Sequence, residues 1–202
     1  MLTQTHKMVL RTLASVIEEA TQEPTDWALI GSSSLQLQGI NIESNTIEFM
    51  TTKNIASIIG DMLGAEIKES QNSPIKGPRL HLEREGISNY IFGDPQFEGE
   101  EENFQPIKIP SLWTGLNDGS LDGHQIPCSP PEWELILAIA LNATNRINEI
   151  QQYLSEFGYD SRLVVRLLRE GHASIATENI VCLLYTSPSP RDQRGSRVAA
   201  AG

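Results

Sequence analysis

Short apolar runs alternate with amphipathic stretches along the first half of the chain. In residues 5–20, apolar side chains recur at spacings of three and four, which predicts a helix with one buried face. Residues 27–30 are all apolar and predict a short buried strand, whereas residues 46–50 alternate apolar and polar positions as a half-buried strand does. Residues 53–63 return to helical spacing, with Thr51-Thr52 placed to cap the helix. This order predicts helices packed on a small sheet.

The second half continues with a hairpin and then becomes helical. Residues 79–83 and 86–92 have the pattern of two paired strands, and residues 107–112 that of an edge strand. Residues 115–123 are rich in turn-forming residues and predict a loop, although their spacing does not match an EF-hand. Beyond Ser129, a plausible N-cap, the apolar spacing predicts a series of helices.

The composition is that of an ordinary globular protein with one domain, or one domain and a small appendage. Its 202 residues are 39% hydrophobic, which suffices for a core, and 20% charged. The net charge of −11 disfavours broad binding to nucleic acid, because phosphates attract basic surfaces. We therefore do not expect a nucleic-acid partner.

The cysteines, histidines and apolar runs exclude further classes. Cys128 and Cys182 lie far apart and the histidines are scattered, so the sequence has no zinc or redox motif. No apolar run reaches the roughly 18 residues of a transmembrane helix, and the N-terminus lacks a long apolar signal core. We expect a cytoplasmic protein with reduced cysteines and no membrane partner.

Two segments depart from the regular pattern. Residues 182–202 lose apolar periodicity and gain Ser, Pro and Arg. We interpret them as a non-native addition that resembles translated adapter sequence, with a disordered native tail as the alternative. The segment 98–102 places several glutamates beside a glycine. Such a charge run is more often a solvated loop than a metal site, so we expect it to be exposed.

The stretch between the first two predicted strands carries the candidate chemistry. Gly31 directly follows the first strand, and Ser32, Ser33 and Ser34 follow the glycine. Glycine tolerates positive φ, and serines can cap the helix that follows. A helix N-terminus offers free N–H groups and the positive end of a dipole, which suits a phosphate. Simple capping of a helix after a strand is the alternative interpretation.

The motifs around this turn resemble those of the nucleotidyltransferase superfamily of the DNA polymerase β type. The shared pattern is an apolar strand, a Gly-Ser turn, a short helix, and a second strand followed by Thr and a helix. Here it is LIGSS, LQLQGI, TIEFMTT and KNIASIIGDML. Two later segments extend the resemblance to small aminoglycoside and lincosamide nucleotidyltransferases, namely the hairpin ending in YIFGD and the sequence IPCSPPE that precedes NRINEIQQYL.

The resemblance implies metal-binding carboxylates on the two strands beyond the turn. The positions on the first strand are Thr46 and Glu48, and the position on the second is Tyr90, or Asn89 if the alignment slips by one residue. Only Glu48 is acidic, so it is the best candidate for a catalytic or metal-binding residue. Mg²⁺ prefers several hard oxygen ligands, so we expect Mg²⁺ as a cofactor only if the protein is active, and otherwise none. Other carboxylates that could compensate are Glu43, Glu83, Glu85 and Asp94.

The resemblance also implies a nucleotide cleft between the turn and a wall of helices. It assigns phosphate binding to Gly31, Ser32 and Ser33. In the helical wall, Arg146 keeps a basic position of the family, whereas the acidic positions after it are only partly kept.

These features predict an α/β fold of the α+β type. We expect a small mixed sheet with nucleotidyltransferase-like topology, helices on one face and a C-terminal helical segment. The expected organisation is an α/β domain over residues 1–125, a helical segment over residues 126–175 packed on it, and the tail at residues 182–202.

Three functions are compatible with the sequence. The absent carboxylates favour a catalytically impaired nucleotidyltransferase-like protein that acts as a nucleotide-binding or regulatory module, with NTP or a protein as partner. The second function is that of an active metal-dependent enzyme transferring NMP from NTP to a hydroxyl of a small molecule, protein or RNA. The third is a non-enzymatic interaction protein such as a toxin–antitoxin component, because fold does not imply function.

Overall fold

The computed structural model describes residues 2–21, 26–70 and 73–186. Its strands are β1 (Trp27–Ile30), β2 (Thr46–Thr51), β3 (Lys68–Ser70), β4 (Ile75–Arg84), β5 (Ile87–Gly93), β6 (Gln96–Glu98), β7 (Asn103–Phe104), β8 (Asn117–Leu121) and β9 (His124–Cys128). Its helices are α1 (Gln4–Ala20), α2 (Gly31–Leu37), α3 (Lys53–Leu63), the 3₁₀ turn η1 (Pro106–Lys108), α4 (Pro110–Thr114), α5 (Pro131–Ala140), α6 (Thr144–Phe157), α7 (Ser161–Glu170) and α8 (Ile175–Thr186).

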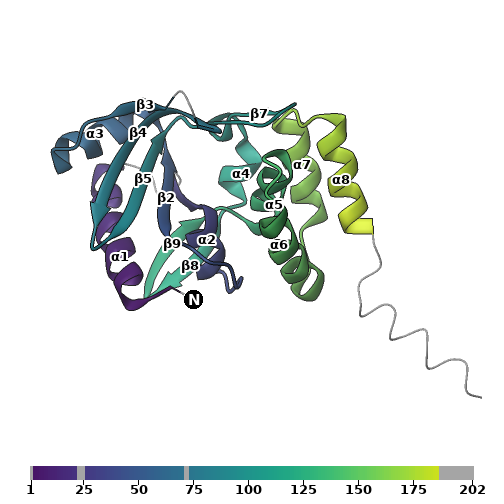
Figure 1. Ribbon diagram of the computed structural model, residues 1–202, viewed down its shortest axis with the longest axis horizontal. Coiled ribbons are helices and arrows are strands. Elements are labelled where there is room, and N and C mark those ends of the chain that lie inside the picture. Colours follow the sequence, from purple (N-terminus) through teal and green to yellow (C-terminus); the bar gives the residue numbers. More distant parts are fainter. Residues whose placement is uncertain (1, 22–25, 71–72, 187–202) are drawn as a thin grey trace, which may run out of the picture.

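The strands form one mixed sheet in the order β7-β6-β4-β5-β2-β1-β9-β8, with β3 paired to β4. The central strand β2 is antiparallel to β1 and parallel to β5. Figure 1 shows α1 and α3 beside the sheet at one end of the molecule and α4 to α8 grouped at the other end. The predicted fold class, a mixed sheet with a C-terminal helical segment, is confirmed.

Two apolar cores lie on opposite faces of the sheet. Ile47 and Phe49 of β2 point into the core that α1 and α3 cover. Met50 belongs to the other core, which Trp133 and the neighbouring helices α5 to α8 complete. Because side chains alternate along a strand, Glu48 lies on the face opposite to Ile47 and Phe49, towards the helical segment. This alternation positions the candidate site between the sheet and the helices.

Local sequence signals fix the ends of α3 and the start of α7. Thr52 is the N-cap of α3, and its side chain accepts a hydrogen bond from the N–H of Ile55. Gly64 ends that helix in the left-handed region, with φ of 61°. Asp160 similarly caps α7 by accepting hydrogen bonds from the N–H groups of Arg162 and Leu163. These caps act within a few residues and are therefore legible in sequence.

Two predicted segments differ from the structure. Residues 107–112 are not an edge strand, because η1 and α4 occupy them and Pro110 stands in the first turn of α4, where its missing N–H costs nothing. Residues 115–123 are not a loop but contain β8, which pairs with β9. A Cβ on Gly119 would lie 2.7 Å from Sγ of Cys128, so the glycine allows close packing here. That packing depends on tertiary neighbours and not on local turn propensity.

Three predicted polar roles also change. Helix α2 begins at Gly31, so the serines lie inside it and do not cap it. Ser129 is not the N-cap of α5, a position that Pro130 takes. Glu102 is buried, unlike the rest of the predicted acidic loop, because its carboxylate accepts hydrogen bonds from the N–H and hydroxyl of Ser174. The first two changes concern where a helix begins, and the third depends on a residue 72 positions away in the chain.

The C-terminal helices share one apolar core with a face of the sheet. Helix α8 extends to Thr186, into the segment predicted as a tail, and residues 187–202 lie outside the described residues. Within the described part of the chain, no helix has the length and apolar character needed to cross a membrane.

Candidate functional site

A row of side chains across the sheet contains two of the three predicted metal positions, Glu48 and Tyr90. Ile30 of β1 pairs with Glu48, Glu48 pairs with Tyr90 of β5, and Tyr90 pairs with His81 of β4. Paired residues in neighbouring strands point to the same face. Asn89 pairs with Ile47 and therefore lies on the opposite face. The register thus places Tyr90, not Asn89, beside Glu48.

Tyr90 lies within an aromatic stack. Its ring centroid is 4.8 Å from that of His81 and 5.9 Å from that of Phe92, with near-parallel planes. The guanidinium carbon of Arg79 lies 5.7 Å from the Tyr90 centroid. The ring therefore contributes packing on this face, and a cation already lies above it.

Gly31 is the first residue of helix α2 and lies close to the carboxylates of Glu134 and Glu48. Its φ is +72°, a conformation that favours glycine, and its N–H donates a buried 2.9 Å hydrogen bond to Oε1 of Glu134. A Cβ at this position would lie 2.5 Å from Oε2 of Glu48. Both the backbone conformation and the approach of Glu48 require a glycine here. The N–H predicted to meet a phosphate instead meets a side chain of the protein.

The serines after Gly31 mostly bond within the protein. The Ser33 hydroxyl donates to the carbonyl of Thr46 at 2.8 Å. The Ser34 hydroxyl donates to the carbonyl of Ser129 at 3.2 Å, which links α2 to the segment before α5. For Ser32, which is partly exposed, the structure gives no hydrogen bond among the described residues. Of the two serines predicted to bind phosphate, only Ser32 has a hydroxyl without a hydrogen-bond partner among the described residues.

Glu134 is the central carboxylate of the site. It lies in the apolar helix α5, with only 1% of its side chain exposed. Oε1 accepts hydrogen bonds from the N–H of Gly31 and the hydroxyl of Ser129, and Oε2 accepts one from Nη2 of Arg146 in α6. A buried carboxylate is tolerated when donors and a counter-charge satisfy it, and these partners do both.

Glu48 lies next to this cluster. Burial raises the pKa of the Glu48 carboxyl above its ordinary value, and the negative charge of Glu134 adds to this rise. The positive charge of Arg146 and the hydrogen bond from the Thr46 hydroxyl act in the opposite direction and lower the pKa, but they do not outweigh burial. The guanidinium of Arg146 therefore pairs with Glu134 and also acts through its charge on Glu48, in a partly enclosed space.

The space enclosed by this cluster is small. A cavity of about 50 Å³ is lined by Gly31, Glu48, Glu134 and Arg146 together with apolar side chains of α5. Pockets for drug-sized ligands usually measure roughly 300–1,000 Å³, so this conformation does not admit a nucleotide. Within residues 2–21, 26–70 and 73–186, no group of three or more His, Cys, Asp or Glu side chains is arranged to hold a metal ion.

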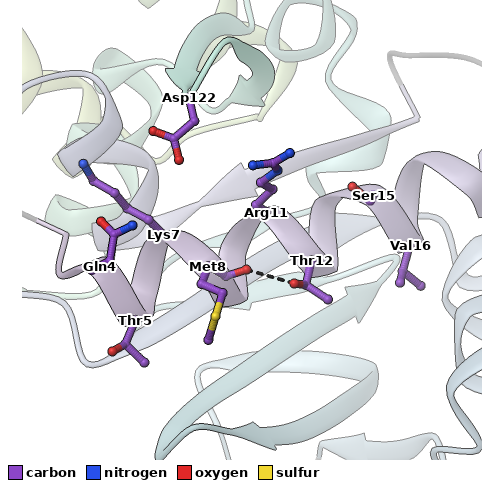
Figure 2. Close-up of a pocket in the computed structure, with 9 residues that line it drawn as sticks. All are labelled: Gln4, Thr5, Lys7, Met8, Arg11, Thr12, Ser15, Val16 and Asp122. Atoms are coloured by element: carbon purple, nitrogen blue, oxygen red, sulfur yellow. Dashed lines mark hydrogen bonds between the residues drawn. The ribbon is translucent and has the colours of Figure 1, made fainter.

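A second hollow lies on the outer side of α1, away from the residues predicted to act. Its volume is about 720 Å³. Figure 2 shows Lys7 and Arg11 of α1 on the side of this hollow where Asp122 of the β8–β9 turn lies. The hollow is lined by exposed and partly exposed positions of α1 and by Asp122, and none of the predicted site residues borders it.

Sequence reasoning missed Glu134, although one signal was present. Glu134 lies within the apolar helix PEWELILAIA, and a buried carboxylate needs hydrogen-bond donors or a counter-charge. Its partner Gly31 lies 103 residues away in the chain, so only the fold shows what the carboxylate binds. Arg146, predicted from the family resemblance to lie in a helical wall of the cleft, lies in α6 and pairs with Glu134.

Comparison with solved structures decides the fold. TM1012 from Thermotoga maritima, a protein assigned to the nucleotidyltransferases, superposes with a TM-score of 0.54 at 22% identity, over 74% of this chain and 94% of that chain. This chain has the nucleotidyltransferase fold. The predicted resemblance is thereby confirmed at the level of the fold. Neither a family model nor a curated protein matches the sequence.

Two further solved structures superpose less well on this chain. The lincosamide adenylyltransferase LnuA, solved with lincomycin bound, has a TM-score of 0.46 and 13% identity over 74% of this chain and 97% of its own. ANT(2″)-Ia, solved in complex with adenylyl-2″-tobramycin, has a TM-score of 0.43 and 14% identity over 88% of this chain and 98% of its own.

The role of Glu134 can be tested by removing its carboxylate. Glu134→Ala leaves the Gly31 N–H, the Ser129 hydroxyl and the Arg146 guanidinium without their acceptor. Breaking a buried ion pair costs roughly 3–5 kcal/mol, and because Arg146 is 28% exposed we expect about 3 kcal/mol from urea unfolding. Glu149→Ala, at an exposed position of α6, should cost less than about 0.5 kcal/mol. A loss below about 1 kcal/mol for Glu134→Ala would contradict its central role.

The burial of Glu48 predicts a pH dependence of stability. Because its pKa in the native state is raised above 4.5, the native state holds this proton more tightly than the unfolded state does. That contribution is full below pH 4.5 and is lost as the pH rises through the raised pKa. Glu48→Gln, which imitates the protonated acid, should therefore gain stability relative to the wild type between about pH 4 and about pH 8 in urea unfolding.

The opposite trend would show that attraction to Arg146 outweighs the burial of Glu48. Glu149→Gln controls for the general effect of removing one negative charge from this acidic chain.

Proposed function

We propose that this chain is a catalytically impaired nucleotidyltransferase-like protein that serves as a nucleotide-binding or regulatory module, with NTP as its ligand. One observation carries the proposal. The N–H of Gly31 and the guanidinium of Arg146 both bind the carboxylate of Glu134, beside Glu48, the one acidic side chain at the three expected metal positions. The protein's own charges thus satisfy the groups that a nucleotide and its metals would use.

The residues at the expected metal positions do not fit a two-metal site. Mg²⁺ requires near-octahedral oxygen ligands at about 2.0–2.1 Å, usually with carboxylates among them. Here Thr46 offers a neutral hydroxyl that already donates to Glu48 at 3.4 Å, and Tyr90 offers a neutral phenol within a ring stack. A fixed guanidinium lies beside the remaining carboxylate. A mechanism through two bound Mg²⁺ ions has too few negative ligands here.

Nucleotide binding in this cleft would require a change of conformation. A phosphate would compete with Glu134 for the Gly31 N–H, and the cavity of about 50 Å³ would have to widen. Since Glu134 belongs to α5 and Arg146 to α6, displacing their contacts would also move those helices against the sheet. A ligand that favours an open form shifts the protein towards it, which is how such a module would signal.

A second candidate function is an active nucleotidyltransferase with altered ligands. The observation that favours it is the position of Glu134, whose charge acts on Glu48 from across the cavity and gives the cleft a second carboxylate. For that function, Arg146 would have to break its ion pair with Glu134. The acceptor would be a hydroxyl of a small molecule, protein or RNA, as the sequence resemblance implies.

Turnover and binding assays distinguish these functions. We expect no pyrophosphate release from any of the four NTPs with Mg²⁺ or Mn²⁺ above that of a blank, and no change on Glu48→Ala. We also expect at least one NTP to raise Tm without added metal, because binding to the native state stabilises it. Pyrophosphate release that is lost in Glu48→Ala but kept in Glu149→Ala would overturn the proposal and favour the active enzyme.

A further inference from the structure

Arg146 lies at the point where the turn and the strand carboxylate meet. A Cβ built on Gly31 would be 3.8 Å from Nη2 of Arg146 and 2.5 Å from Oε2 of Glu48. The same Nη2 donates to Glu134. The guanidinium therefore forms an ion pair with Glu134 of α5 and lies close enough to Glu48 of β2 for its charge to lower the pKa of that carboxyl. All three residues line the same cavity, so a metal ion that contacted both carboxylates would have to come close to this guanidinium.

Arg146 is held in this position by helix α6 and by the residues that surround its side chain. It lies in the first turn of α6, where its N–H donates to the carbonyl of Ala143 at 3.0 Å. Only 28% of its side chain is exposed, and its Nε is buried without a hydrogen-bond partner in the described part of the chain. Apolar residues that include Leu141 and Ala143 line the same cavity as Arg146. An apolar wall keeps the aliphatic stem in place and directs the charged end towards the carboxylates.

We propose that Arg146 is the resident cation of this cleft and determines its ion specificity, because it neutralises Glu134 and Glu48 and excludes divalent cations from the space between them. The inference deepens the proposed function, since it names the residue that replaces the metal ions. Arginine suits the role because its guanidinium stays charged at all relevant pH values and donates hydrogen bonds in fixed directions.

The charge pattern makes a direct prediction about variants. In the wild type, a divalent cation near Glu48 would be repelled by the adjacent guanidinium. In Arg146→Ala, the same two carboxylates face a widened cavity with no positive charge, and carboxylate oxygens are the ligands that Mn²⁺ and Mg²⁺ prefer. Removing the arginine should therefore create an affinity for divalent cations that the wild type lacks.

The experiment measures Mn²⁺ binding by electron paramagnetic resonance and by Tm. We expect no Mn²⁺ binding that depends on Glu48 in the wild type. In Arg146→Ala we expect at least about a tenfold gain in Mn²⁺ affinity, and a rise in Tm of about 3 °C or more at Mn²⁺ concentrations near ten times its dissociation constant. The double variant Arg146→Ala with Glu48→Gln should lose this gain, because one of the two carboxylates is gone.

Matched variants separate charge from packing. Arg146→Lys keeps a cation in the cleft and should not gain Mn²⁺ binding, and Arg162→Ala, at an exposed position of α7, should behave as the wild type. Arg146→Gln keeps a donor for Glu134 and most of the side-chain length, so it serves if Arg146→Ala does not fold.

Two results would overturn the inference. One is Mn²⁺ bound to the wild type and lost in Glu48→Gln. The other is folded Arg146→Ala or Arg146→Gln protein that binds Mn²⁺ no better than the wild type. Both results are independent of NTP turnover in the wild type, which is the result that would overturn the proposed function instead.

Discussion

The carboxylate of Glu134 has to find hydrogen-bond donors because the helix that carries it is buried along its whole length. It finds them in three places: the turn after β1, the segment before α5, and the first turn of α6. A buried charge without partners is strongly destabilising, so these contacts constrain how the helical segment docks on the sheet. The closure of the cleft and the surroundings of Glu48 depend on this one group, which acts together with the shared apolar core to position the helices.

The hydrogen bond from Gly31 to Glu134 also explains why the turn after β1, although suited to phosphate, has no free N–H at Gly31 to bind one. A glycine with positive φ after a strand presents its N–H, and in this chain the N–H is already bonded to an anion. An internal carboxylate and an external phosphate are alternative acceptors for one donor. The balance between them depends on the cost of separating Glu134 from Arg146, and that cost links ligand binding to the arrangement of α5 and α6.

Much of the fold could be predicted from the sequence because it depends on local signals. The alternation in β2, the Thr52 cap and the left-handed Gly64 each act within a few residues. The order of motifs around Gly31 was enough to predict the nucleotidyltransferase fold. The β8–β9 hairpin was missed because Gly119 and its neighbours have turn-like propensities, and only their contact with Cys128 and α2 favours strands.

The candidate site was only partly predictable for the same reason. The face of the sheet that carries Glu48 and Tyr90 follows from strand alternation, and the register then excludes Asn89. The hydrogen bonds of Ser33 and Ser34 were not predictable, because their acceptors come from β2 and from the segment before α5. Glu134 was not predicted, because nothing near it in the chain indicates that its partner is the backbone of Gly31.

The Gly31 amide proton gives the most direct test of this account, because it reports on the one bond from which the rest follows. We predict that in ¹⁵N-resolved NMR spectra this amide exchanges slowly with solvent. Its proton shift should move upfield in Glu134→Ala, as expected when an amide loses a charged acceptor, whereas the Gly64 amide at the end of α3 should not change. A Gly31 amide that exchanges as freely as an exposed one in the wild type, or whose shift is the same in Glu134→Ala, would contradict the account.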